Sequence, residues 1–147
     1  MHHILHDYSE LLSAYKEIER CHTPPLNRHS LYSFIAHYRK FAVFFSNPGN
    51  RGARERRRKR GEMHASDFTN KALRYDLREW RRWENHMNTH FFHLNLFRTE
   101  NTRPWTGHQE VPRMMQQMDV AWKLFVANLK EPWLSEYSDE MALRASA

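Results

Sequence analysis

The most apolar stretch of this 147-residue sequence is Ser30-Leu-Tyr-Ser-Phe-Ile-Ala-His-Tyr-Arg-Lys-Phe-Ala-Val-Phe-Phe-Ser46. Its apolar side chains recur every three to four positions, at Leu31, Phe34, Ile35, Tyr38, Phe41, Ala42 and Phe45. This spacing predicts a helix from Ser30 to about Ser46 with one buried face. Because no other segment is as apolar, we expect this helix to be central. The turn residues Asn47-Pro-Gly-Asn50 end it.

Helical spacing continues on both sides of this stretch. The pattern predicts a first helix from Asp7 to about Arg20 and a third from Ser66 or Asp67, as N-cap, to about Phe97. A fourth helix is expected from about Gln109 to Leu129, with Pro112 in its first turn, where proline is tolerated. The sequence therefore predicts an all-α fold, an antiparallel bundle of four main helices with a short C-terminal helix.

The chain length fits one helical domain, residues 1–147. Within it we expect a basic inter-helix loop at 47–64, and a short helix and frayed tail at 133–147. The only cysteine, Cys21, excludes an internal disulfide and a thiolate zinc cluster. No apolar run is long enough for a membrane helix or a signal peptide, so we expect a soluble, cytoplasmic protein that does not contact a membrane.

The net charge of +6 comes from one segment, Arg51–Arg60. This decad holds seven basic residues and one acid, whereas the rest of the chain balances 16 basic residues against 16 acids. Clustered arginines bind phosphate backbones. The sequence therefore predicts RNA contact through the basic loop, by Arg54, Arg56, Arg57, Arg58, Lys59 and Arg60. The alternative is a solvated loop that binds nothing or an acidic partner.

A histidine stripe follows in the predicted third helix, where His86, His90 and His93 stand at i, i+4 and i+7. Side chains at this spacing share one helix face. Arg81 and Arg82 precede them. The stripe has three interpretations: a metal site that uses His86 and His90, a general acid or base beside an arginine, or half-buried imidazoles packed against aromatic rings.

The segment Arg81-Arg-Trp-Glu-Asn-His86 is an Arg-x4-His sequence in a small helical domain. In this it resembles the HEPN family of helical, often ribonucleolytic domains. The resemblance implies RNA cleavage without metal or other cofactor, at the interface of a homodimer. It also implies that His86 assists proton transfer at the ribose 2′-hydroxyl, while Arg81 stabilises charge on the scissile phosphate.

Two alternatives to a catalytic Arg81–His86 pair stay open within this segment. In the first, we expect Arg82, His90 and His93 to form an additional site beside the pair. The phrase Asn88-Thr-His-Phe-Phe-His93 also resembles the family, and if His93 is the counterpart, Asn88 replaces the catalytic arginine. The leading hypothesis is an HEPN-like RNA-associated domain that acts as a metal-independent endoribonuclease. The alternatives are a non-catalytic helical protein-interaction module and a helical metal-binding protein that uses His86 and His90.

Overall fold

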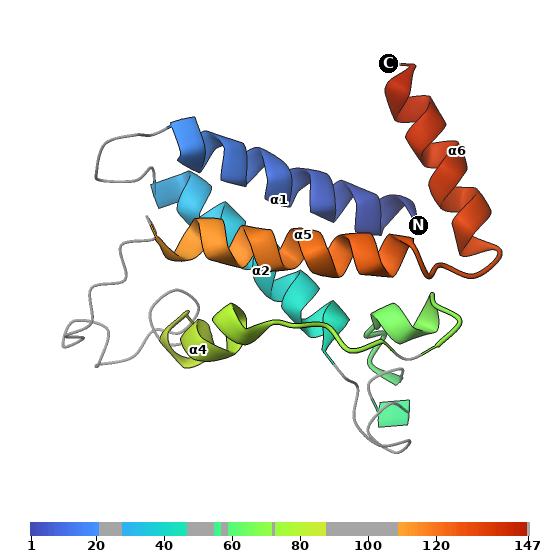
Figure 1. Ribbon diagram of the computed structural model, residues 1–147, viewed down its shortest axis with the longest axis horizontal. Coiled ribbons are helices and arrows are strands. Elements are labelled where there is room, and N and C mark those ends of the chain that lie inside the picture. The colour runs from blue at the N-terminus through green and yellow to red at the C-terminus, as the bar shows by residue number, and fades with distance from the viewer. Residues whose placement is uncertain (21–27, 47–54, 57–58, 72, 88–108, 147) are drawn as a thin grey trace.

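The computed structural model describes residues 1–20, 28–46, 55–56, 59–71, 73–87 and 109–146 (Figure 1). These residues form a 3₁₀-helix, η1 (Ala65–Asp67), and the α-helices α1 (His2–Arg20), α2 (Arg28–Phe45), α4 (Arg78–Met87), α5 (Glu110–Val126) and α6 (Trp133–Ala145). In these ranges the only β-type pairing is an isolated bridge between Thr69 and Leu129. The predicted all-α fold with a short C-terminal helix is therefore confirmed.

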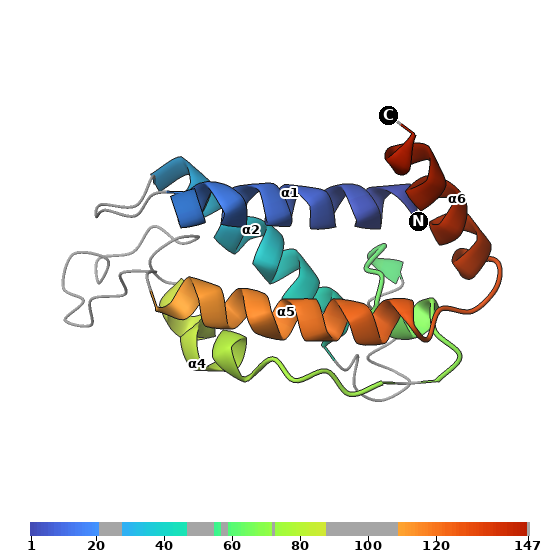
Figure 2. The same cartoon turned by 45° about the horizontal axis from the view of Figure 1, so that its top comes forward.

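Helices α1 and α5 lie side by side and run in opposite directions, while α2 crosses them diagonally (Figures 1 and 2). The Tyr8 ring of α1 stacks on the Trp122 ring of α5, with ring centroids 4.0 Å apart and planes 9° apart. Stacked aromatic pairs contribute about 0.5–1.5 kcal/mol beyond the area that they bury. This contact therefore helps to hold α1 against α5.

The predicted second helix is central, as expected. On α2, Phe34, Ile35 and Tyr38 are fully buried, and α5 supplies a facing set of fully buried side chains, Val111, Met114, Met118 and Phe125. Full burial of such side chains contributes about 1.5–3 kcal/mol each. Met114 and Met118 are therefore core residues, and their spacing is helical.

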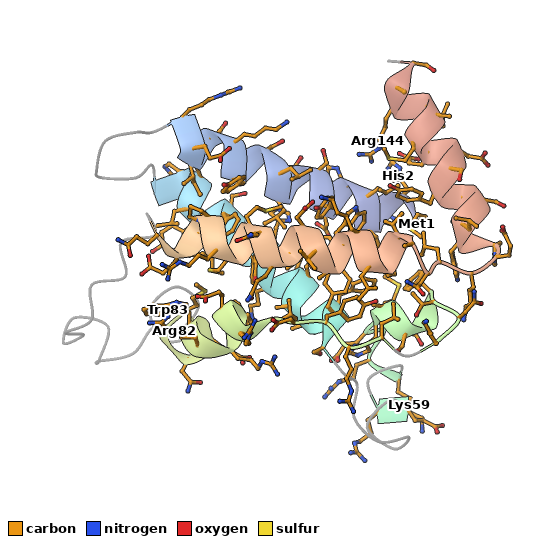
Figure 3. All side chains as sticks on the ribbon, viewed as in Figure 1. Met1, His2, Lys59, Arg82, Trp83 and Arg144 are labelled. Carbon is orange, nitrogen blue, oxygen red and sulfur yellow. The ribbon has the colours of Figure 1, made fainter. Side chains whose placement is uncertain are left out.

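Helix α6 stands apart from the other helices and lies beside the N-terminus (Figure 3). None of its side chains is buried. Two polar contacts tie it to the first two residues: the Met1 ammonium lies 3.1 Å from Glu136 Oε2, and His2 Nδ1 lies 3.1 Å from Glu140 Oε1. Trp133, at its first turn, packs against Phe68 with ring centroids 5.0 Å apart.

The predicted boundaries of three helices are wrong. Helix α5 ends at Val126 and not at the predicted Leu129. Helix α1 begins at His2 instead of Asp7, because Ile4 and Leu5 extend its buried face by one turn. The third helix does not begin at Ser66 or Asp67: the chain forms only η1 there, and α4 begins at Arg78. The predicted end of that helix, at about Phe97, lies outside the described residues.

Backbone pairing with the chain that follows α5 explains why no long helix starts at Asp67. The Lys130 amide donates to the Phe68 carbonyl at 3.0 Å, and the Asn70 amide donates to the Asn128 carbonyl at 3.3 Å. Helical geometry would break these bonds. The described part of this segment is therefore not helical before α4, and Asp76 Oδ1 accepts a hydrogen bond from the Arg78 amide at 3.2 Å, which caps α4.

Candidate functional site

The structure describes only part of each predicted site. Arg81 and Arg82 are exposed on α4, whereas His86 belongs to α4 but its side chain lies outside the described residues. His90 and His93 lie outside them entirely. Of the predicted RNA contacts, Arg56, Lys59 and Arg60 are described and exposed, and Arg54, Arg57 and Arg58 are not described.

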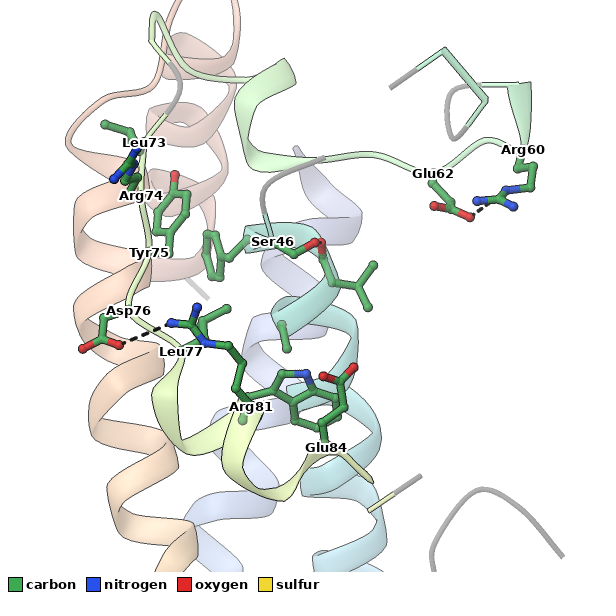
Figure 4. A pocket seen from close by; sticks show the side chains of 14 residues that line it. Ser46, Arg60, Glu62, Leu73, Arg74, Tyr75, Asp76, Leu77, Arg81 and Glu84 are labelled. Atoms are coloured by element: carbon green, nitrogen blue, oxygen red, sulfur yellow. Dashed lines mark hydrogen bonds and ion pairs between the residues drawn. The ribbon is translucent and has the colours of Figure 1, made fainter. Parts of the chain in front are cut away.

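A pocket of about 880 Å³ opens between the end of α2, the extended segment 73–77 and α4 (Figure 4). We call it the arginine pocket. Its polar side chains are Ser46, Arg60, Glu62, Arg74, Tyr75, Asp76, Arg81 and Glu84, and its apolar ones are Ala42, Val43, Phe45, Leu73, Leu77 and Trp80. The volume is in the range that small ligands occupy in proteins.

The arginine pocket joins two features that are separate in the sequence. Arg60 is the last residue of the basic decad, and Arg81 comes from the Arg-x4-His sequence on α4. Both line the pocket, together with Arg74 from the extended segment. Sequence analysis missed Arg74, because a helix was expected where the chain is extended.

Asp76 is the pocket carboxylate that contacts two arginines of α4. It lies 2.8 Å from Arg78 through Oδ2, and its Oδ1 lies 3.9 Å from Arg81 Nη2 (Figure 4). The first contact is a close ion pair, whereas the second is at the limit of one. Arg81 therefore keeps donors for another anion, while Arg78 does not line the pocket.

The carboxylate of Glu84 is the least neutralised of the three in the pocket. Glu62 Oε1 lies 3.0 Å from Arg60 Nε, and Asp76 is paired as described above. Glu84 is half-buried, and in the described part of the chain it has no ion-pair partner. Sequence analysis did not single out Glu84, although its spacing of three residues from Arg81 indicates a shared helix face.

Tyr75 forms an aromatic wall of the pocket. Its ring contacts the buried ring of Phe45, with centroids 4.5 Å apart. Its hydroxyl is buried without a hydrogen-bond partner among the described residues. Burial raises the pKa of Tyr75 to about 12, so the hydroxyl stays neutral and can only donate or accept a hydrogen bond.

Arg82 lies outside the arginine pocket. Its guanidinium carbon lies 5.3 Å from the centre of the Trp83 ring, a cation–π contact, and it does not line the pocket (Figure 3). The structure therefore separates Arg82 from Arg81, which the sequence groups together.

Within the described residues, no group of three or more histidine, cysteine or acidic side chains could hold a metal ion. The side chains of the predicted metal pair, His86 and His90, lie outside the described residues. No helix in the described ranges is long and apolar enough to cross a membrane.

Comparisons with protein-family models, with curated proteins and with solved structures found no match to this chain. Function resides in the residues of the site, because a fold alone does not specify it.

Proposed function

We propose that this protein is an RNA-associated helical domain that binds single-stranded RNA in the arginine pocket. The observation that carries the proposal is that Arg60, Arg74 and Arg81 line one pocket, at the end of the decad that holds the net charge. Arginine matches phosphate geometry with two parallel donors and remains charged at all physiological pH values.

Tyr75 supports single-stranded RNA over a duplex. Its partly exposed ring lines the same pocket as the three arginines. Unpaired bases stack on such rings, whereas the bases of a duplex are not available for stacking. A pocket that combines arginines with an aromatic wall suits one nucleotide whose base is turned out from its neighbours.

The proposal extends to metal-independent cleavage, as the resemblance to HEPN domains implies. Arg81 would then stabilise the charge that develops on the scissile phosphate. His86 remains the proton-transfer group that the resemblance implies. Cleavage of RNA in the presence of EDTA, lost in Arg81→Ala, is the expected result.

Homodimer formation is part of the same proposal. Support comes from large apolar side chains that α5 and α6 leave exposed, among them Val120 at 60% and Leu143 at 68%. Apolar side chains that are exposed on one subunit are often buried in contacts between subunits. A mass near twice 17.9 kDa in light scattering is the expected result.

Fluorescence anisotropy with a labelled single-stranded RNA of about 12 nucleotides tests the binding proposal. Loss of one charged hydrogen-bonding partner costs about 1.5–3 kcal/mol, so Arg81→Ala should weaken binding roughly tenfold or more. Arg113→Ala is the matched control, because Arg113 is exposed on α5 and does not line the pocket. Equal affinities for the two variants would contradict the proposal.

A further inference from the structure

The carboxylates of the arginine pocket differ in how their charge is compensated. Arg60 neutralises Glu62, and Arg78 neutralises Asp76. Among the described residues of the pocket, Glu84 is the carboxylate without an ion pair. A carboxylate that is held by an arginine is a poor proton acceptor, whereas an unpaired one can accept a proton from a ligand.

Helix geometry places Glu84 near Arg81. A residue in a regular α-helix turns by about 100°, so positions three apart differ by about 60° around the axis and positions five apart by about 140°. Positions 81 and 84 of α4 therefore share a face, whereas positions 81 and 86 do not. Figure 4 shows Arg81 and Glu84 on the same side of α4, at the pocket.

We propose that Glu84 is the general base of RNA cleavage in the arginine pocket, in the role that the sequence assigns to His86. This inference rests on the proposed function. It replaces only the proton acceptor: Arg81 keeps its place beside the phosphate. The substrate is single-stranded RNA with an intact ribose 2′-hydroxyl at the cleaved position.

The reaction is an internal phosphoryl transfer. The Glu84 carboxylate takes the proton of the 2′-hydroxyl while the 2′-oxygen forms a bond to the adjacent phosphorus. The bond from phosphorus to the 5′-oxygen of the next nucleotide breaks, and that oxygen takes a proton from water. The hydroxide that remains is neutralised by the proton that Glu84 releases, which restores the carboxylate. The products are a 2′,3′-cyclic phosphate and a 5′-hydroxyl.

Arg81 is suited to stabilise the charge that develops on the phosphate in this reaction. Its guanidinium lies 3.9 Å from Asp76 Oδ1, a loose contact that leaves most of its donors for the phosphate. Asp76 is therefore a positioning residue, since it also caps the helix that carries Arg81 and Glu84. Charge stabilisation by an arginine and proton removal by a carboxylate act on neighbouring atoms of one nucleotide.

Parallel binding and cleavage measurements on full-length protein test this inference. The probes are a labelled single-stranded RNA, and the same sequence as DNA, both in EDTA. Glu84→Gln should bind RNA within about twofold of the unaltered protein and should cleave it about 10²- to 10⁴-fold more slowly. Glu19→Gln is the control for loss of a carboxylate, because Glu19 is exposed on α1 and does not line the pocket, and it should keep the full rate. Mass spectrometry should find a 2′,3′-cyclic phosphate, and the DNA should remain intact.

The outcomes separate the two proposals. If the unaltered protein does not bind RNA, the proposed function fails. If it binds and cleaves RNA while folded Glu84→Gln keeps its full rate and His86→Gln loses it, the assignment of Glu84 alone is overturned. RNA binding without cleavage by the unaltered protein also overturns this assignment and leaves the binding proposal intact. Circular dichroism of each variant identifies a loss that is caused by unfolding.

Discussion

Arg81 and Glu84 lie less than one helical turn apart on α4 and line the same pocket. A cationic donor and an unpaired carboxylate thus stand together on a helix that Asp76 caps. The pocket also takes Arg60 from the end of the basic decad. Charge recognition and proton transfer can therefore be tested separately at one site.

Arg74 should contribute to RNA affinity by charge alone. No carboxylate of the described residues pairs with it. The logarithm of the affinity falls as the logarithm of the salt concentration rises, and each phosphate contact makes this slope steeper by about 0.7 for a single strand. Arg74→Ala should make the slope shallower by about this amount in an anisotropy titration, and Arg113→Ala should leave it unchanged. An identical slope for Arg74→Ala and the unaltered protein would show that Arg74 does not contact phosphate.

Asp76 should stabilise α4 through its cap. Removal of such a cap costs about 0.5–2 kcal/mol, so Asp76→Ala should lower the free energy of unfolding by about 1 kcal/mol. Asp76→Asn keeps a side-chain acceptor for the Arg78 amide and should lose less. Urea titrations of both variants measure the difference. Equal losses would mean that the ion pairs of Asp76 outweigh its cap.

Removal of the Tyr38 hydroxyl should stabilise the protein. Tyr38 is fully buried, and its hydroxyl has no hydrogen-bond partner among the described residues. Such a group costs about 1–3 kcal/mol, so Tyr38→Phe should raise the free energy of unfolding by up to that amount. Tyr32→Phe, at an exposed position, is the control for the urea titration. A decrease for Tyr38→Phe would show that the hydroxyl is bonded in solution.

His37 should make the fold sensitive to mild acid. Its side chain lies between α1 and α2, 3.3 Å from Asp7 Oδ1, an oxygen that Lys40 also contacts. Burial, and then the charge of Lys40, lower the pKa of His37 below its ordinary value, although Asp7 and Glu10 oppose this. The unfolded chain therefore binds the proton more readily, and stability falls as pH drops below about 6.5 towards the lowered pKa.

A variant isolates this effect. His37→Gln should lose less stability than the unaltered protein between about pH 7.5 and pH 5.5 in urea titrations, because glutamine does not titrate. His3→Gln, at an exposed position of α1, should keep the full loss. The same loss in both variants would assign the acid sensitivity to other groups.

The helices that carry long apolar stripes could be predicted from the sequence. Helix α2 differs from its expected range by one or two residues, and α5 begins one residue after Gln109, because buried side chains every three to four positions specify a helix locally. The early part of the predicted third helix could not be found in this way. That part is non-helical because of two backbone hydrogen bonds between residues far apart in the sequence. The Asn70 amide donates to Asn128, and the Lys130 amide donates to Phe68.

The candidate site was predicted only in part, for a related reason. Arg81 and Arg60 were named from the sequence, but nothing in the sequence places them in one pocket. That proximity arises because the extended segment 73–77 brings α4 beside the end of α2. One local signal was available: Asp76 followed by Glu79 is the spacing of a helix start, and it would have placed the beginning of α4 near Arg78.

Photochemical cross-linking tests the central claim, that RNA occupies the arginine pocket, most directly. Ultraviolet irradiation of the protein with a single-stranded RNA containing 4-thiouridine, followed by trypsin and mass spectrometry, maps the contact. Cleavage after Arg74 and Arg78 releases Tyr75-Asp-Leu-Arg78. We predict that this peptide carries the cross-linked nucleotide and that Arg81→Ala reduces its yield. Cross-links confined to peptides of α1 or α6, with none on this peptide, would contradict the claim.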